Sequence, residues 1–133
     1  MAYEESLRSI SLNADATLAM YTGVPGVPGS ANPNYGRQYR FVKVTGANQV
    51  GLAVGDENEN SIGVMQNKPQ VTGQAATVSI HGVSMVMAGG TFDAGALVGP
   101  DSEGRAVSGG TSGIALAAAG QANELVPVLL QVS

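Results

Sequence analysis

The sequence contains a single histidine, His81, and catalytic chemistry that needs a general base of this type must be built around it. Ser79 and Ser84 are near it in sequence, so a Ser-His-Asp arrangement would draw on them. However, His81 falls on the polar side of an alternating run without a pocket signature, where an ordinary surface histidine is the more frequent outcome. GxSxG, HExxH and GxxxxGKS/T patterns are absent from the sequence. We therefore predict no catalytic residue and no enzymatic activity.

The segment DENENSIG begins like a calcium-binding loop, because Asp56, Asn58 and Asn60 supply alternating oxygen ligands. The match ends there, since Ser61 replaces the glycine of position six and Asn67 replaces the bidentate glutamate of position twelve. A structural zinc site is also poorly supplied, because the chain has no cysteine and one histidine. We expect a solvated acidic turn here, and neither a metal nor another cofactor in the protein.

Residues 35–44, YGRQYRFVKV, interleave basic side chains with aromatic rings, as proteins that bind single-stranded nucleic acids do. Arg37, Arg40 and Lys43 are half of the six Lys and Arg residues of a chain whose net charge is −4. Such a chain has little long-range field to attract phosphates. We interpret the segment as a strand with a salt-bridged face, and we predict no nucleic-acid partner.

The elements that must position these side chains are predicted by short apolar runs, which turn residues separate at intervals of about 8 to 12. This spacing is typical of an all-β sandwich or barrel. One alternating run is interrupted at Gly82, where we expect a bulge or tight bend, and Val83, Met85 and Met87 follow it as a second period-two row. Methionines in a core with few large side chains are expected to fill gaps.

Three further segments of the β pattern carry specific expectations. Residues 101–104 predict a hairpin turn in which Gly104 takes a positive φ. Residues 114–119, IALAAA, fit a short helix or a strand, and their length favours the strand. The final apolar run contains Pro127, which cannot donate to a ladder, so we expect an edge strand or a bulge there.

The chain divides into three regions by composition. Residues 1–22 alternate loosely and predict an extended N-terminal arm, residues 23–36 form a Gly/Pro-rich loop, and residues 37–133 form the β domain. The sequence contains no membrane-length apolar run and no apolar run of signal-peptide length near its amino terminus, so we expect neither a membrane partner nor secretion.

The β domain has little bulk with which to fill a core. Hydrophobic residues make up 44% of the 133 residues, so one domain can fold, but Phe92 is the only aromatic residue after Phe41. Scaffolds with thin cores gain stability from disulfides, metals or partner subunits. Because the chain lacks cysteine, we expect partner subunits to supply the missing stability.

Three segments in a fixed order resemble the capsid decoration, or cement, proteins of tailed bacteriophages. They are SIGVMQNKP, then GQAATVSIHGVSMVMAGGTFDAGALVGPDSEGRAV, then SGIALAAAGQANELVPVLL, and the resemblance as a whole covers approximately residues 48–132. The resemblance implies a compact β-clip or β-tulip-like domain. It also implies a homotrimer on the outer surface of the virion head, assembled in the host cytoplasm, with the major capsid protein as its partner.

The resemblance leaves the arm outside the match, and we predict from physical reasoning that the arm adds a strand to a sheet edge of the capsid. The residues predicted to bind the capsid are the larger apolar side chains of the arm: Tyr3, Leu7, Ile10, Leu12, Leu18 and Met20. Two alternatives stay open at this point. One is a biotinyl/lipoyl-like or hammerhead β carrier domain, and the other is a phage tail or fibre module.

Overall fold

The computed structural model describes residues 8–18, 37–55, 61–69 and 72–130, and within these ranges the chain is built from strands without a helix. The all-β prediction is confirmed. No helix that is long and apolar enough to cross a membrane occurs in these ranges. The strands are β1 Arg8–Ala14, β2 Phe41–Gly46, β3 Gln49–Leu52, β4 Ser61–Met65, β5 Ala75–Met87, β6 Leu97–Pro100, β7 Ala106–Ser108, β8 Gly113–Ala115 and β9 Leu125–Leu130.

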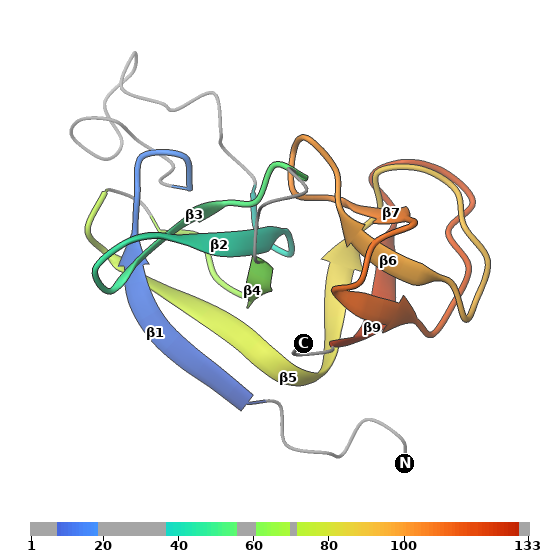
Figure 1. Cartoon of the computed structure of the whole chain (residues 1–133), viewed down its shortest axis with the longest axis horizontal. Coiled ribbons are helices and arrows are strands. Elements are labelled where there is room, and N and C mark those ends of the chain that lie inside the picture. The colour runs from blue at the N-terminus through green and yellow to red at the C-terminus, as the bar shows by residue number, and fades with distance from the viewer. Residues whose placement is uncertain (1–7, 19–36, 56–60, 70–71, 131–133) are drawn as a thin grey trace.

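The first half of the fold is a closed five-stranded barrel. Its strand order is β1-β3-β2-β4-β5, and β5 pairs back with β1 to close the ring (Figure 1). The β1–β3 pair is parallel, and the other pairs of the ring are antiparallel. The barrel is filled by apolar residues that alternate along its strands. Its buried core consists of Ala14, Leu18, Val42, Val50, Leu52, Met65, Ala76 and Val78.

The second half is a smaller sheet that begins on the same long strand. The second half of β5 pairs with β9, and the order continues through β8 and β6 to β7. An isolated bridge between Ala88 and Ala106 joins β7 back to the end of β5, so this sheet also nearly closes on itself. Its core is packed against the outside of the barrel. The buried residues are Phe41, Ala53, Val64, Val86, Ala88, Phe92, Val98, Ala106, Ala115, Ala119, Val126, Val128 and Leu130.

Glycine at two predicted positions permits the connections between these sheets. Gly82 has φ 99°, and β5 leaves the barrel for the second sheet at this residue. Gly104 has φ 75° in the turn between β6 and β7, as the sequence predicts. A side chain on Gly104 would also meet the Leu52 Cδ1 atom at 2.7 Å, because this turn packs closely against the barrel.

The prediction for the last strand is wrong in one respect. β9 lies between β5 and β8 and pairs with both, without a register shift at Pro127. The carbonyl oxygen of Pro127 accepts a hydrogen bond from the Leu116 amide, at the point where β8 has already ended. Because the two polar backbone groups of one strand residue point to the same side, the missing N–H of Pro127 falls beyond the β8 ladder. A central strand can therefore carry this proline.

Residues 8–18 do not form a free arm, contrary to the expected boundary at residue 22. β1 pairs with β5 over six register positions and meets β3 at Asn13 and Ala14. The Thr17 hydroxyl accepts a hydrogen bond from the Leu52 amide, and Leu18 is only 2% exposed. The strand completes the barrel, so its buried apolar residues contribute to the stability of the fold. The remaining parts of the expected arm and the whole 23–36 loop lie outside the described residues.

Candidate functional site

The structure does not bring His81 together with the two serines near it in sequence. His81 is exposed on β5, whereas Ser79 is fully buried and its hydroxyl has no hydrogen-bond partner among the residues that the structure describes. Ser84 accepts a hydrogen bond from the Gln66 side chain at 2.8 Å and donates one to the Met85 carbonyl. Neither hydroxyl is linked to the imidazole, so these residues do not form an activated nucleophile.

No group of three or more potential metal ligands occurs in the part of the chain that the structure describes. Asp56, Asn58 and Asn60 lie outside that part. A small pocket between the two halves is lined by residues that include Phe41, Ser61 and Ser112, with room for about one water molecule. A pocket of this size does not hold an organic substrate.

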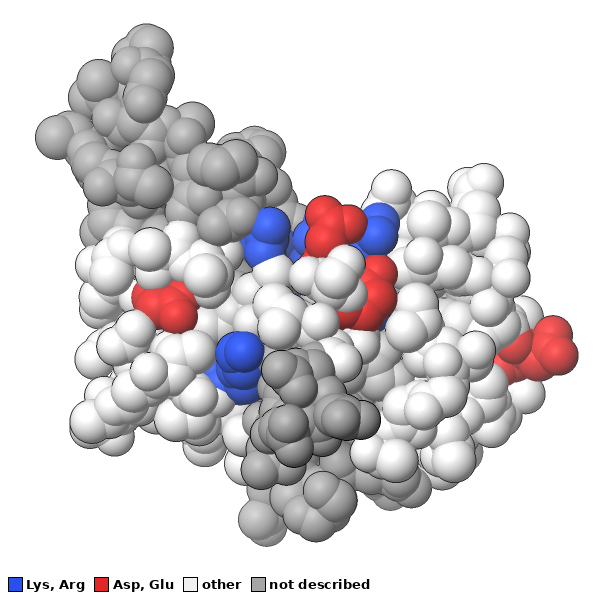
Figure 2. Space-filling view, turned by 45° about the horizontal axis from the view of Figure 1, so that its top comes forward, with Lys and Arg blue, Asp and Glu red and all other residues white. Residues whose placement is uncertain are grey.

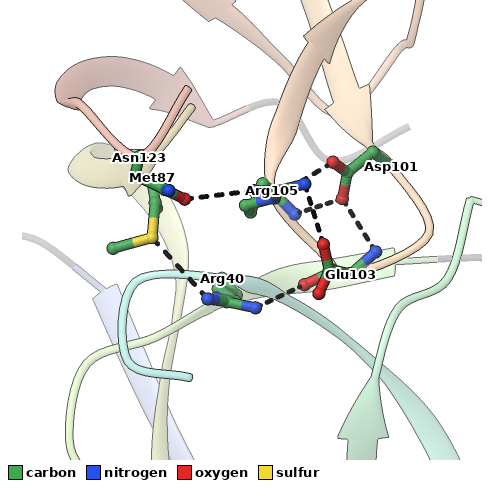
Figure 3. Close-up of polar contacts among 6 residues, drawn as sticks. All are labelled: Arg40, Met87, Asp101, Glu103, Arg105 and Asn123. Carbon is green, nitrogen blue, oxygen red and sulfur yellow. Dashed lines mark hydrogen bonds and ion pairs between the residues drawn. The ribbon is translucent and has the colours of Figure 1, made fainter. Parts of the chain in front are cut away.

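Charged side chains gather instead at the junction of the two halves (Figure 2). Six residues from different parts of the chain meet there, and Figure 3 labels all of them. We call them the arginine cluster: Arg40, Met87, Asp101, Glu103, Arg105 and Asn123.

The 101–105 turn carries the acidic half of the arginine cluster. One Asp101 carboxylate oxygen accepts backbone N–H bonds from Glu103 at 2.8 Å and from Arg105 at 2.9 Å. The second oxygen pairs with the Arg105 Nε at 3.2 Å, and the Arg105 guanidinium also reaches Glu103 at 2.8 Å and the Asn123 side chain at 3.0 Å. Arg105 is thus fully engaged and fixes the turn.

Arg40 is the less satisfied arginine of the cluster. Its guanidinium donates to the Glu103 carbonyl at 3.2 Å and to the Met87 sulfur at 3.7 Å, while its buried Nε has no partner among the described residues. Burial lowers the pKa of the Arg40 guanidinium, and the nearby Glu103 charge opposes this shift. Burial and the neighbouring Arg40 charge likewise lower the pKa of Arg37. A carboxylate placed near the two guanidinium groups would favour their charged form and so oppose the lowering of their pKa.

Of the described residues in the basic segment, only residues 41–44 lie in the predicted strand. Arg37 and Arg40 precede β2, and Tyr39 has φ 64° in the turn between them. Phe41 is fully buried between the two halves, so its ring is not available to stack on a base. The sequence shows Arg40 but not its partners, because the Glu103 carbonyl and the Met87 sulfur come from a turn and a strand far along the chain.

The residues predicted to bind the capsid are not all available on the surface. Leu18 is buried, and Leu12 packs partly against the barrel core. Ile10 is exposed on β1. Tyr3, Leu7 and Met20 lie outside the described residues. The predicted set is therefore divided between the fold and segments for which the structure gives no position.

No family model and no curated protein matches the chain. A solved structure with a similar fold is "the crystal structure of head fiber gp8.5 N base in bacteriophage phi29". The two share 17% sequence identity with a TM-score of 0.53, and the match covers 95% of each chain. The likeness concerns the fold, and it spans both halves of the protein.

Proposed function

We propose that this protein is a structural component of a phage virion that binds the outer surface of the head, after assembly in the host cytoplasm. It acts as a homotrimer on the major capsid protein and stabilises the capsid lattice against the pressure of packaged DNA. The observation that carries the proposal is the fold likeness to the phi29 head fibre base over 95% of both chains. The resemblance of residues 48–132 to phage decoration proteins supports it independently.

The geometry of the described residues supports a scaffold rather than a reaction centre. The charged residues of the arginine cluster fix the junction of the barrel and the second sheet, and the histidine is not linked to the serines. A protein that only holds other proteins together needs rigid, well-joined surfaces and no activated nucleophile.

The mechanism that we propose is avidity across capsomer boundaries. A single contact of about −4 kcal/mol corresponds to about millimolar affinity. Three such contacts on one rigid trimer act together, and linkage strengthens binding about 10² to 10⁴ fold without a new contact. Outward pressure must then break several contacts at once.

Within the expected arm, Tyr3, Leu7, Ile10 and Met20 remain our candidates for capsid contacts. Because β1 begins at Arg8 and completes the barrel, removal of residues 2–20 would destroy the fold and test nothing about binding. Removal of residues 2–7 leaves β1 intact. We expect this shortened protein to keep its oligomeric state but to bind heads at least about tenfold more weakly.

Co-sedimentation with undecorated phage heads tests the proposed function directly. The full chain should pellet with heads at saturable stoichiometry, and should raise the temperature at which the heads release their DNA. Albumin at the same concentration serves as a control for trapping. A full chain that stays in the supernatant at every concentration would overturn the proposal.

The printed name of the structural neighbour favours one second candidate, the base of a fibre on a phage head. Electron microscopy of the decorated heads separates the two, because a cement protein forms compact knobs and a fibre projects from the shell. The carrier-domain alternative has less support, since the 101–104 hairpin tip has no lysine.

A further inference from the structure

The outer face of the second sheet is apolar across four strands. One cross-strand row consists of Val83, Leu129, Ile114 and Leu97, which are register partners in β5, β9, β8 and β6. Direct partners in antiparallel pairs place their side chains on the same face of a sheet. The row therefore runs without interruption across the sheet.

A second row lies beside the first. Met85 is opposite Pro127, and Pro127 is hydrogen-bonded to Leu116 just beyond the end of β8. Met87 and Leu125 form a third pair at the end of the sheet. We call these three rows the apolar outer face. No Asp, Glu, Lys or Arg is part of any row, and most of the surface on the side of β6 and β9 is uncharged in Figure 2.

Several large side chains of this sheet are on its outside, although Leu130 and Phe92 are buried in its core. Its interior is filled mainly by small residues such as Ala115, Val86 and Val128. On the outside, Leu97 is 50% exposed, and Met85, Leu116 and Leu125 are each at least 40% exposed. A soluble sheet in isolation usually has the opposite distribution, with polar residues facing water. A contiguous apolar face of this kind marks an interaction surface.

The occupant that fits this face best is another copy of the same chain. Each chain has a net charge of −4, so copies repel one another except where they can meet through an uncharged surface. Permanent interfaces between identical subunits resemble a core cut in half, which describes this face. A second copy is also present wherever the protein is made, so the face is covered from the start.

The borders of the face fit the same reading. The arginine cluster adjoins it at Met87, whose sulfur accepts a hydrogen bond from Arg40. An interface typically has an apolar centre and a polar rim in which arginine is enriched. Edge pairing is not a competing route at β7, because the Gly89 amide already bonds to the Ala106 carbonyl and joins this strand to the end of β5.

We propose that the apolar outer face of β5, β9, β8 and β6 is the surface through which copies of this chain associate. The inference deepens the proposed function, because it assigns to named residues the self-association that the proposed homotrimer requires. The arginine cluster, which adjoins the face at Met87, would form the rim of the interface.

Sedimentation velocity of the full chain and of Leu97→Glu and Leu116→Glu tests this assignment. Both side chains point to solvent in the single chain, so each variant should fold. A carboxylate buried at the centre of an apolar interface should weaken association about 30-fold or more. We expect trimers of the parent protein and monomers of both variants at low micromolar concentration. Circular dichroism checks that the variants keep the β fold.

Val44→Glu is the matched control, because Val44 is 56% exposed on β2 in the barrel and lies outside the apolar outer face. It adds the same charge and should leave the oligomer unchanged. The oligomer should also persist at high salt, which an association through the arginine cluster alone would not. A parent protein that is monomeric, or variants that keep the parent mass, would overturn the inference.

Head binding is measured on the same samples and separates the two proposals. Variants that become monomeric while the parent trimer ignores heads would support the interface and contradict the proposed function. Variants that remain trimeric while the parent binds heads would do the reverse. A monomeric parent whose head binding is lost in Leu97→Glu would show that this face contacts the capsid, and would contradict self-association.

Discussion

At the residue scale, the 101–105 turn shows how one carboxylate can organise a corner of the fold. Asp101 accepts two backbone N–H bonds and pairs with Arg105, and its side chain is only 17% exposed. The sequence predicts the turn and the positive φ of Gly104, because both depend on residues within the turn itself. The sequence does not predict that Arg105 reaches Asn123, since that contact depends on how the second sheet closes.

Replacement of Asp101 by alanine should lower the free energy of unfolding by about 1 to 3 kcal/mol. The cause is that the exposed amide of Glu103 and the partly buried amide of Arg105 lose their acceptor. Asp93→Ala is the control, because Asp93 is exposed and should change stability by about 0.5 kcal/mol or less. Urea denaturation of the two variants measures the difference. Equal midpoints for both variants would contradict this role of Asp101.

Alanine replacements at two glycines with positive φ distinguish the energetic cost of backbone strain from that of close packing. An added methyl group at Gly104 would meet Leu52 at 2.7 Å and the Phe41 carbonyl at 3.0 Å, whereas at Gly73 it would meet nothing within 4 Å. Both replacements by alanine should cost about 1 to 2 kcal/mol because of the backbone conformation. Gly104→Ala should lower the free energy of unfolding by about a further 1 to 3 kcal/mol because of the clash. Thermal unfolding of both variants gives the comparison, and equal losses would show that the turn can move away.

At the element scale, β1 and β9 show that sequence patterns do not predict which strands pair. The sequence pattern does not predict the pairing of β1, because its alternation is loose and its partners, β3 and β5, are remote in sequence. The sequence predicts β9 at an edge because Pro127 has no backbone N–H to donate. The sequence does not show which side of the strand the missing N–H would face. Both errors concern pairing, which is a property of the assembled sheet.

The place of residues 8–18 in the barrel predicts a large difference between two apolar residues of this segment. Leu18→Ala removes a buried side chain and should lower the free energy of unfolding by about 2 to 5 kcal/mol. Ile10→Ala affects a residue that is 39% exposed and should cost about 1 kcal/mol or less. Chemical denaturation measures both. If residues 1–22 were a free arm, neither replacement would change stability.

The second sheet presents the same limit of pattern analysis on its two faces. Beyond Gly82 both sides of β5 are largely apolar, so alternation alone does not tell which row is buried. The row of Ser84 and Val86 is inside, whereas the predicted row containing Met85 is outside. Within β5, the smaller Ser84 and Val86 are buried, and Met85 is 40% exposed. Of Met65, Met85 and Met87, only Met65 belongs to a buried core cluster, that of the barrel.

At the scale of the whole molecule, the two barrels share β5 and the arginine cluster, so they should unfold as one unit. If association covers the apolar outer face, stability must depend on subunit concentration, because mass action favours the folded oligomer. A tenfold increase in concentration should raise the melting temperature by about 2 to 6 °C.

Leu97→Glu should abolish this concentration dependence and should melt at a temperature similar to that of the dilute parent protein. Val44→Glu should keep the dependence, since its added charge lies outside the apolar outer face. Calorimetric scans over an about hundredfold range of protein concentration are enough to distinguish the two variants. A parent melting temperature that does not move with concentration would mean that the second sheet is stable with its leucines in water. The thin core would then suffice without partner subunits.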